Sequence, residues 1–193
     1  MEQFGIMDSM PTGWNVKNFG QACTLVNGRA FKPSDWAKQG VPIVRIQNLN
    51  DPTAEYNYYN GEIEDKYWID NGSLLFAWSG TPGTSFGAFI WSGGKAVLNQ
   101  HIFQVFPCDE ISLQFLKCSF DGHMDEIIMK AHGGVGLRHI TKKELETIAL
   151  VVPPKAVQDR FVAFAAQTDK SKYNGFSVIV ELMEFLLSGM KGV

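Results

Sequence analysis

The stretch GSLLFAWSGTPGTSFGAFIW, residues 72–91, places a loop rich in glycine and hydroxyl groups between two apolar runs. Both runs, SLLFAWS (73–79) and GAFIW (87–91), have the aliphatic and aromatic content of β-strands. The loop lacks the GK[ST] ending of a phosphate-binding P-loop, and a strand follows it where a nucleotide cradle needs the N-terminus of a helix. The stretch therefore predicts a β-hairpin and argues against nucleotide binding.

The segments around this hairpin continue the β-rich pattern as far as residue 153. Turn signals such as Asn27-Gly28 and Asn60-Gly61 separate further expected strands: PIVRIQNL (42–49), IFQVF (102–106) and IALVV (148–152). Helical periodicity is confined to ISLQFLKCSF (111–120) and HMDEIIMKA (123–131). Thr141-Lys142-Lys143-Glu144 forms an S/T-x-x-E capping box and predicts a short helix before the last strand.

At Pro153-Pro154 the pattern changes to long helical periodicity. Apolar residues recur in steps of three and four at Val157, Phe161 and Phe164 and then at Phe176, Ile179, Met183, Leu186 and Met190. Such a helix either packs on its own domain or pairs with a partner helix. The sequence thus predicts an α+β protein, with a mixed β-rich domain over residues 1–153 and a long C-terminal α-helix, a coiled-coil-like spacer, over 154–193.

Composition limits the class of protein further. The 193 residues are 45% hydrophobic and 19% charged, with a formal net charge of −3, which suits a folded globular protein. No basic start followed by an apolar run is visible at the N-terminus, and no apolar run approaches the ~18 residues of a membrane span. Three widely spaced cysteines without a CxxC pair fit reduced thiols, and together these features predict a cytoplasmic protein with no membrane partner.

Catalytic and metal-binding patterns are weak. Asp51, Glu64 and Lys66 imitate the spacing of a metal-dependent, PD-ExK-like nuclease, in which carboxylates hold Mg²⁺, but the spacing is loose and common, and a solvated face is the better explanation. The acids between 121 and 126 suit a helix N-terminus. There is no G-x-S-x-G elbow and no histidine pair at i, i+4. The residues point away from an enzyme, and a β-rich module that binds something other than DNA stays open as an alternative.

Polar residues gather at the ends of the expected strands. They are Arg45, Gln47 and Asn48, the run Asn99-Gln100-His101, and the segment from Gly134 to His139. Arginine, asparagine and glutamine make bidentate contacts to base edges, whereas serine, threonine and loop N–H groups suit phosphates. Between Lys130 and Lys143 the chain also carries four basic residues and no acid. These features permit DNA binding without proving it.

Several blocks together resemble the specificity subunits of type I restriction–modification enzymes. They are Gly13-Trp14, the NG-x-x-F-K segment from Asn27 to Lys32, VPIVRIQNLND, GSLLFAWSG, the NQH strand and PP-x-x-x-Q at the start of the long helix. The resemblance covers essentially the whole chain. It implies a non-catalytic subunit with a target recognition domain that reads half of a bipartite DNA sequence, and a helical spacer that sets the distance to a second recognition domain.

The resemblance also implies partners. Modification subunits would bind S-adenosylmethionine and methylate adenine, and restriction subunits would use ATP and Mg²⁺ to translocate and cut, so this chain itself would need no cofactor. Because only one recognition domain is present, a fragment or a half-length subunit is possible, and a homodimer or a partner-completed pair is expected. Its helix would pair through Phe161, Phe164, Phe176, Ile179, Met183 and Leu186.

The same resemblance assigns DNA contacts to the strand-end loops. Arg138, His139, Lys142, Lys143 and Lys95 are expected near phosphates. The residues expected near bases are Arg45, Gln47, Asn48, Ser79, Gly80, Thr81, Thr84, Ser85, Asn99, Gln100 and His101. Trp78 and Phe86 are expected to anchor the 79–85 loop, which would leave its hydroxyl groups free to face DNA.

Overall fold

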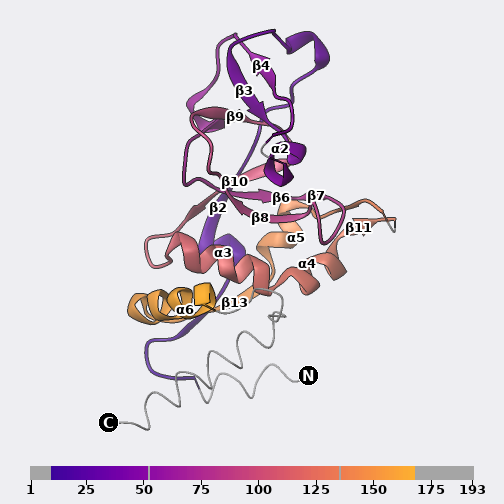
Figure 1. The fold of residues 1–193 in the computed structure, drawn as a ribbon. Coiled ribbons are helices and arrows are strands. Elements are labelled where there is room, and N and C mark those ends of the chain that lie inside the picture. The colour runs from indigo at the N-terminus through magenta and orange to yellow at the C-terminus, as the bar shows by residue number, and fades with distance from the viewer. Residues whose placement is uncertain (1–9, 52, 135, 168–193) are drawn as a thin grey trace.

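The computed structural model describes residues 10–51, 53–134 and 136–167. Figure 1 shows a central sheet with helices on one side of it and a smaller sheet on the other. Phe176, Ile179, Met183 and Leu186 lie outside the described residues, so the proposed pairing seam beyond residue 167 stays a prediction. The mixed α+β class is confirmed for the described part of the chain.

The central sheet is built around the 72–91 hairpin. Its strand order is β2-β10-β6-β8, and its strands are β2 (Cys23–Asn27), β10 (Ile102–Pro107), β6 (Leu74–Ala77) and β8 (Gly87–Ile90). Strands β6 and β8 pair antiparallel, with Ala77 opposite Gly87. All four residues of β6 are buried. Successive side chains of a strand point to opposite faces, so both faces of this strand must be covered.

Helices cover one face of the central sheet and form the larger core with it. These helices are α1 (Phe19–Ala22), α3 (Leu113–Gly122), α4 (Met124–Lys130) and α5 (Lys142–Glu146). Leu74 and Phe76 of β6 belong to this core. The ring of Phe120 lies 4.9 Å from that of Phe76 and stacks on that of Phe19 at 4.3 Å. The helices expected near 111–120 and 123–131 and the capped helix after Thr141 are therefore confirmed.

The other face of the central sheet meets the smaller sheet, through Leu75, Ala77 and Ile102. This second sheet runs β4-β3-β9-β5, with β3 parallel to β9 and the other pairs antiparallel. Its strands are β4 (Asn57–Tyr59), β3 (Val41–Val44), β9 (Ala96–Leu98) and β5 (Trp68–Ile69). Two short 3-10 helices, Pro33–Asp35 and Asp65–Tyr67, lie in its connections.

The expected strand over 42–49 is wrong in its second half. Strand β3 ends at Val44, and helix α2 (Ile46–Asn50) follows. The side chain of Asn48 turns back and accepts a hydrogen bond from the backbone N–H of Arg45 at 3.0 Å. This local bond closes the first turn of the helix, as a capping box does, and overrides the β-propensity of the preceding apolar residues.

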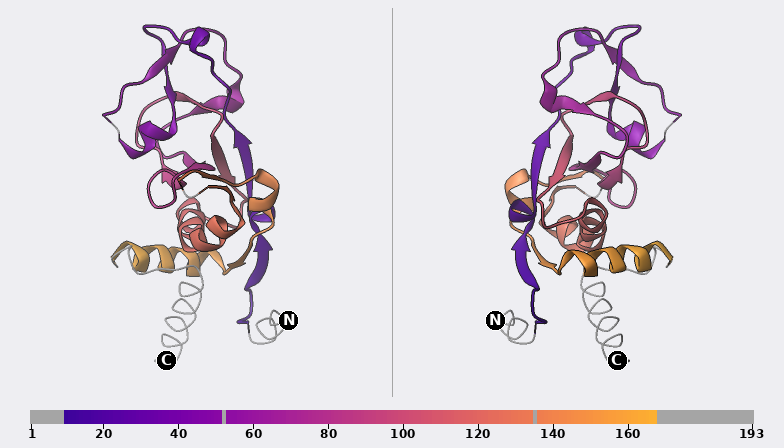
Figure 2. Two further views of the ribbon diagram at one scale, coloured as in Figure 1. Left: turned by 90° about the vertical axis from the view of Figure 1, so that its right-hand side faces the viewer. Right: turned by 90° about the vertical axis from the view of Figure 1, so that its left-hand side faces the viewer.

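At the base of the molecule, the first and last described strands pair. Strand β1 (Asn15–Asn18) runs antiparallel to β13 (Ala149–Val152), and Asn15 faces Val152. Helix α6 (Lys155–Gln167) follows, and Figure 2 shows it lying across the base beneath α3. The strand expected over 148–152 is thus confirmed.

Helix α6 is attached to the domain by both a polar and an apolar side chain. Gln158 is fully buried: its Oε1 accepts from the N–H of Ser112 at 2.8 Å, and its Nε2 donates to the carbonyls of Glu110 and Pro153. Phe161 is 6% exposed and packs edge-on against Phe115. The assignment of Phe161 to a partner helix is therefore wrong, because this ring lies in the domain's own core.

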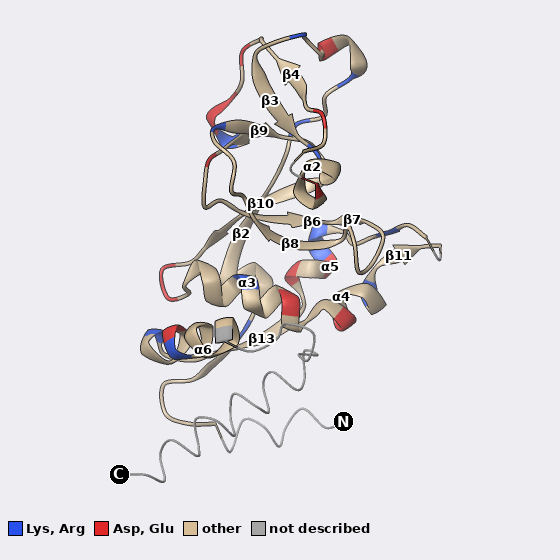
Figure 3. Ribbon diagram, viewed as in Figure 1, with Lys and Arg blue, Asp and Glu red and all other residues tan. Residues whose placement is uncertain are grey.

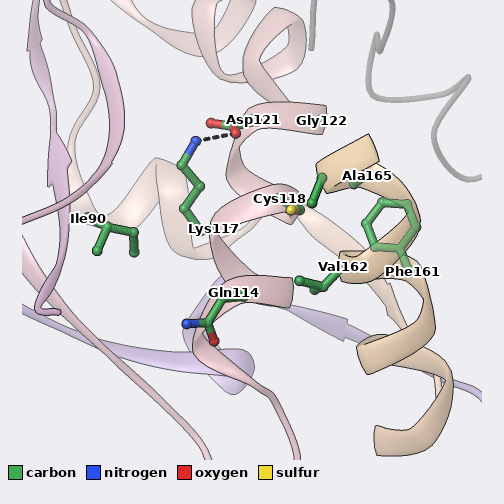
Figure 4. Close-up of a pocket in the computed structure, with 10 residues that line it drawn as sticks. Ile90, Gln114, Lys117, Cys118, Asp121, Gly122, Phe161, Val162 and Ala165 are labelled. Atoms are coloured by element: carbon green, nitrogen blue, oxygen red, sulfur yellow. Dashed lines mark hydrogen bonds and ion pairs between the residues drawn. The ribbon is translucent and has the colours of Figure 1, made fainter. Parts of the chain in front are cut away.

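Beside these contacts, α3, α6 and the end of β8 border a groove of about 420 Å³ (Figure 4). Phe161 and Val162 line it from α6, and the Lys117–Asp121 ion pair lies on its α3 side. Among the described residues, no helix is long and apolar enough to cross a membrane.

Candidate nucleic-acid interface

A three-stranded ladder joins the glycine-rich loop to a distant hairpin. Strand β12 (Arg138–His139) pairs on one side with β7 (Ser79–Gly80) and on the other with β11 (His132–Gly133). Arg138 lies opposite Gly80, and His139 lies opposite Ser79. Gly80 has a φ of +152°, and a Cβ there would lie 2.5 Å from Ser85 Oγ, so only glycine lets the chain fold back this tightly.

The hydroxyl groups of the loop are used within the protein. Thr81 Oγ1 donates to the carbonyl of Gly136 at 2.7 Å, and Thr84 Oγ1 donates to the carbonyl of Thr81 at 3.1 Å. Ser85 Oγ accepts from the N–H of Thr81 at 2.8 Å. The expectation that these hydroxyls are free is therefore wrong, because they hold the loop in one shape. Phe86 is buried, as expected of an anchor.

Trp78 connects this loop to the turn Asn99–His101. Its indole N–H lies 3.1 Å from both the carbonyl of Gln100 and Asn27 Oδ1, and its ring lies 5.2 Å from that of His101. His101 is exposed, but Asn99 is buried at 7% exposure. The turn therefore offers His101 and part of Gln100 to the surface, whereas Asn99 belongs to the framework.

The hairpin formed by β11 and β12 is held by its own side chains. Arg138 Nη1 donates to the carbonyl of Ile128 at 2.8 Å, at the end of α4. His132 Nε2 lies 2.5 Å from Glu144 Oε1, and Thr141 Oγ1 donates to the other oxygen of that carboxylate at 2.6 Å. The hydrogen bonds from Thr141 and His132 lower the pKa of Glu144 from 4.5 to about 2. The ionised carboxylate thus fastens the hairpin to the start of α5.

We call the combined surface the β7 surface. It consists of Ser79–Ser85, Gln100 and His101, His132–Gly134, and Gly136–His139. Segments from three separate regions of the sequence meet there, joined by the ladder, by the Thr81–Gly136 hydrogen bond and by Trp78. Thr81, Thr84, His101, Leu137 and His139 are exposed on it.

Basic charge beside this surface is partly neutralised. Lys142 Nζ donates to the carbonyl of Leu25 at 2.8 Å and lies 3.6 Å from Glu146. Figure 3 accordingly shows both blue and red segments on α5. Lys143 is exposed and makes no hydrogen bond or ion pair with the described residues. Lys143 is therefore the cation on α5 that is best placed to meet an anion.

Two of the expected contact groups lie elsewhere. Arg45 Nη1 donates to Asn57 Oδ1 at 3.1 Å, and Gln47 Nε2 donates to the carbonyl of Glu55 at 3.3 Å. Asn48 is 1% exposed, so its assignment to bases is wrong. The N–H of Asn99 donates to the carbonyl of Val44 at 3.0 Å, which joins the Asn99–His101 turn to the end of β3, directly before α2.

Lys95 does not join the other basic residues. Its ammonium lies 4.4 Å from the centre of the Trp68 ring, in a cation–π contact at the β5 edge of the smaller sheet. It precedes β9, whereas the Asn99–His101 turn follows that strand, so the two lie at opposite ends of it. Lys95 is thus placed apart from the Asn99–His101 turn.

The nuclease alternative requires Asp51, Glu64 and Lys66 to act together at a metal ion, but their side chains have other partners. Glu64 pairs with Lys66 at 2.6 Å, and the Asp51 carboxylate accepts hydrogen bonds from the hydroxyl and the N–H of Thr53, which lower its pKa. No group of three or more histidine, cysteine or acidic side chains able to hold a metal ion occurs within residues 10–51, 53–134 and 136–167.

Sequence reasoning missed the contacts that assemble the surface. Strand β7 is only two residues long, and its partner β12 lies more than 50 residues away in the sequence. No local sequence pattern therefore predicts the pairing of these strands. His132 lies in the basic stretch between Lys130 and Lys143, and no local pattern indicates its pairing with Glu144. The capping box did signal Glu144, since its carboxylate had to be near Thr141.

Comparison with known proteins shows the family to which this chain belongs. Residues 11–174 match the family model described as the type I restriction modification DNA specificity domain. The chain is 26% identical over 171 residues to the EcoBI specificity subunit of Escherichia coli. That alignment covers 85% of this chain and 35% of that protein, so the chain spans about a third of its relative's length.

Solved structures share the fold. The HsdS subunit from Thermoanaerobacter tengcongensis superposes with a TM-score of 0.62 at 16% identity, over 91% of this chain and 40% of that one. The S subunit of the type I restriction–modification system from M. genitalium gives a TM-score of 0.58 at 13% identity, over 79% and 38%. The resemblance carried by the sequence blocks is thus confirmed, and the chain belongs to the family of type I restriction modification DNA specificity domains.

Proposed function

We propose that this chain is a sequence-specific DNA-recognition subunit, or part of one, in a type I restriction–modification complex. It reads one half of a bipartite target in double-stranded DNA and has no catalytic role of its own. Residues 1–153 form the recognition domain, and residues 154–193 form the helical spacer. Family membership supports the assignment as a specificity subunit. The structure of the β7 surface supports our proposal that this surface contacts the DNA bases.

The single observation that supports the β7 surface as the DNA-contacting surface is the pairing of β7 with β12. It brings two exposed loops together on one face and leaves backbone and side-chain groups of both at the surface. Sequence reading needs several groups held in fixed mutual positions, since base edges present donors and acceptors in a fixed pattern. The hydrogen bonds of Thr81, Thr84 and Ser85 supply that rigidity.

Within this proposal, the exposure of each side chain decides whether it contacts DNA or belongs to the framework. Gln47, His101 and the loop around Thr84 lie near base edges, together with the exposed part of the β11–β12 hairpin. Lys143, His139 and Lys142 meet phosphates, and Lys95 meets the flanking backbone. Asn48, Gly80 and Asn99 are buried and act as framework. Phosphate contacts position a protein on DNA, whereas base contacts specify the sequence.

The proposed partners supply the chemistry. Modification subunits bind S-adenosylmethionine and methylate adenine in the target, and restriction subunits use ATP and Mg²⁺. The complex works in the cytoplasm. Because one recognition domain reads only half of a bipartite site, a second specificity half completes the complex, and we propose a second copy of this chain. A symmetric pair would read a pseudo-palindromic target.

The function is tested by co-expressing this chain with a candidate modification subunit in a host whose own adenine methyltransferases are deleted. Long-read sequencing then maps methylated adenines. The expected result is one bipartite motif that disappears when this chain is left out. Methylation that is absent, or that keeps the same motif without this chain, would overturn the proposal.

The pairing of two copies is tested separately on the purified full-length chain. Ile179→Asp combined with Met183→Asp places two charges in the proposed seam, and dimers should be lost in sedimentation velocity runs. Ser171→Asp and Ser177→Asp, at positions off the proposed seam, serve as the matched control. An unchanged monomer–dimer balance in the seam variant would rule out this mode of pairing.

A further inference from the structure

The β11–β12 hairpin presents an apolar side chain to solvent beside the β7 surface. Leu137 is 62% exposed, whereas Leu74, Leu75, Leu98, Leu116, Leu145 and Leu150 are each 2% exposed or less. Leu49 and Leu113 are partly buried, so Leu137 is the most exposed leucine of the described residues. A single exposed apolar side chain is common on protein surfaces. Leu137 is informative because of its place: it lies on the β11–β12 hairpin, in the β7 surface, whose other described residues are polar or glycine apart from Pro82.

The exposure of Leu137 is fixed by its neighbours. On one side, the carbonyl of Gly136 accepts the hydrogen bond of Thr81 Oγ1. On the other side, Arg138 pairs with Gly80 and donates to the carbonyl of Ile128. Gly133 has a φ of +122°, and a Cβ there would lie 2.2 Å from the carbonyl oxygen of Leu137. The backbone around Leu137 is thus held from three directions.

The glycines at 134 and 136 make the hairpin narrow, although the folded domain does not require glycine at either position. A Cβ at Gly134 or Gly136 would meet nothing within 4 Å, and neither residue needs a left-handed φ. The folded domain would accept a side chain at both positions. Because Gly134 and Gly136 carry no side chains, the described part of the hairpin is a slim two-stranded ribbon, with strands about 5 Å apart. The major groove of B-DNA, about 12 Å wide, admits a two-stranded β-ribbon.

The chemistry of Leu137 selects one feature of that groove. The C5-methyl group of thymine is the apolar feature that a major-groove base edge offers, and apolar side chains recognise it by contact. Arg138 beside it is committed to holding the hairpin, so it is not the reading group. Lys143 and His139 are exposed and have the chemistry to hold the phosphates on either side.

We propose that Leu137 is a specificity-determining residue that enters the major groove on the β11–β12 ribbon and contacts the methyl group of a thymine in the target. This inference rests on the proposed function and names one base contact within it. Leu137→Ala should therefore relax the target motif at a single position, which is thymine in the motif of the unaltered protein.

The test uses the full chain co-expressed with the modification subunit, with methylated motifs mapped for three variants. Leu137→Ala should give a motif that is degenerate at one thymine. Leu137→Met keeps an apolar contact and should keep the thymine. Phe106→Ala is the matched control, because Phe106 is 45% exposed at the end of β10 far from the Gln100–His101 turn, and it should leave the motif unchanged.

A binding measurement gives an independent readout. Duplexes carrying the mapped motif are made with each thymine replaced singly by deoxyuridine, which removes only the methyl group. One replacement should weaken binding of the unaltered complex about four-fold, the worth of one buried methyl group. The same replacement should leave the Leu137→Ala complex unaffected.

The outcomes separate the two proposals. If the unaltered chain yields a motif and Leu137→Ala yields the same motif with undiminished occupancy, the thymine contact is overturned and the proposed function stands. If the unaltered chain directs no motif at all, the proposed function falls and this inference falls with it. Thermal melting of Leu137→Ala should match that of the unaltered protein, since the side chain is exposed.

Discussion

The hydroxyl group of Thr81 donates a hydrogen bond to the carbonyl of Gly136 at 2.7 Å, across 55 residues of sequence. It joins the tip of one surface loop to the other. Thr81→Val removes the donor with little change of shape, and it should loosen the 132–139 hairpin. We expect a loss of about 1 kcal/mol in the free energy of unfolding. We also expect faster amide exchange at His139 and weaker DNA binding by the complex.

Thr81→Ser provides the control for that change. It keeps the hydroxyl and should keep both the exchange protection and the DNA affinity. If Thr81→Val and Thr81→Ser bind DNA equally well and protect the His139 amide equally, the hydrogen bond does not organise the surface.

The contact of Glu144 with His132 and Thr141 makes the stability of the domain depend on pH. The pKa of Glu144 is lowered from 4.5 to about 2, so its ionised form stabilises the native state above about pH 4.5. That contribution is lost as the pH falls through about 2. Glu144→Gln should therefore be less stable than the unaltered protein at pH 6, and the difference should shrink steadily between pH 4.5 and 2 in urea denaturation.

Glu55→Gln is the comparison for Glu144, since its carboxylate is exposed and makes no hydrogen bond or ion pair with the described residues. It should change the free energy of unfolding little at any pH in that range. A Glu144→Gln deficit that stays constant down to pH 2 would contradict the assigned role of the carboxylate.

The buried amide of Gln158 is expected to hold α6 on the domain. Gln158→Leu leaves the N–H of Ser112 and the carbonyls of Glu110 and Pro153 without their partner. Each unsatisfied buried group costs about 1–3 kcal/mol, so a loss of about 3 kcal/mol or more is expected. Thermal melting should detect it as a large fall in Tm, whereas Gln39→Leu, at an exposed position, should melt like the unaltered protein.

Salt dependence distinguishes a phosphate contact from a structural lysine. Each phosphate contact contributes about 0.9 to the slope of log affinity against log salt concentration. Lys143→Gln should therefore reduce the slope for the complex by about 0.9 on the same scale. Lys66→Gln should leave it unchanged, because Lys66 is paired with Glu64 on the smaller sheet's side of the molecule. Equal slopes for all three proteins would exclude Lys143 from the interface.

Local patterns were sufficient for much of the framework. The hairpin around Ser79–Gly87, the helices over 111–131 and the capping box at Thr141 follow from neighbouring residues alone, because their stabilising contacts span only a few positions. The segment after Val44 shows where such reasoning fails. There, one side-chain hydrogen bond from Arg45 N–H to Asn48 converts an apparent strand into a helix.

The β7 surface depends on contacts that no short sequence pattern contains. Pairing of Arg138 with Gly80 and the reach of Lys142 to the carbonyl of Leu25 join segments that are 58 and 117 residues apart. Phe161 fits the same helical period whether it faces a partner or its own domain, and only the position of Phe115 decides between them. The burial of Asn48, Asn99 and Phe161 is likewise a property of the folded chain that the residue types alone do not give.

The antiparallel pairing of β1 with β13 has an implication for protein engineering. Because Asn15 faces Val152, the polypeptide enters and leaves the folded unit at the same end. Chains with adjacent entry and exit points tolerate insertion into, or exchange with, other polypeptides. The unit from Asn15 through α6, whose Gln158 and Phe161 belong to the same core, is therefore a suitable cassette: grafted into another protein, it should bring its proposed DNA-binding preference with it.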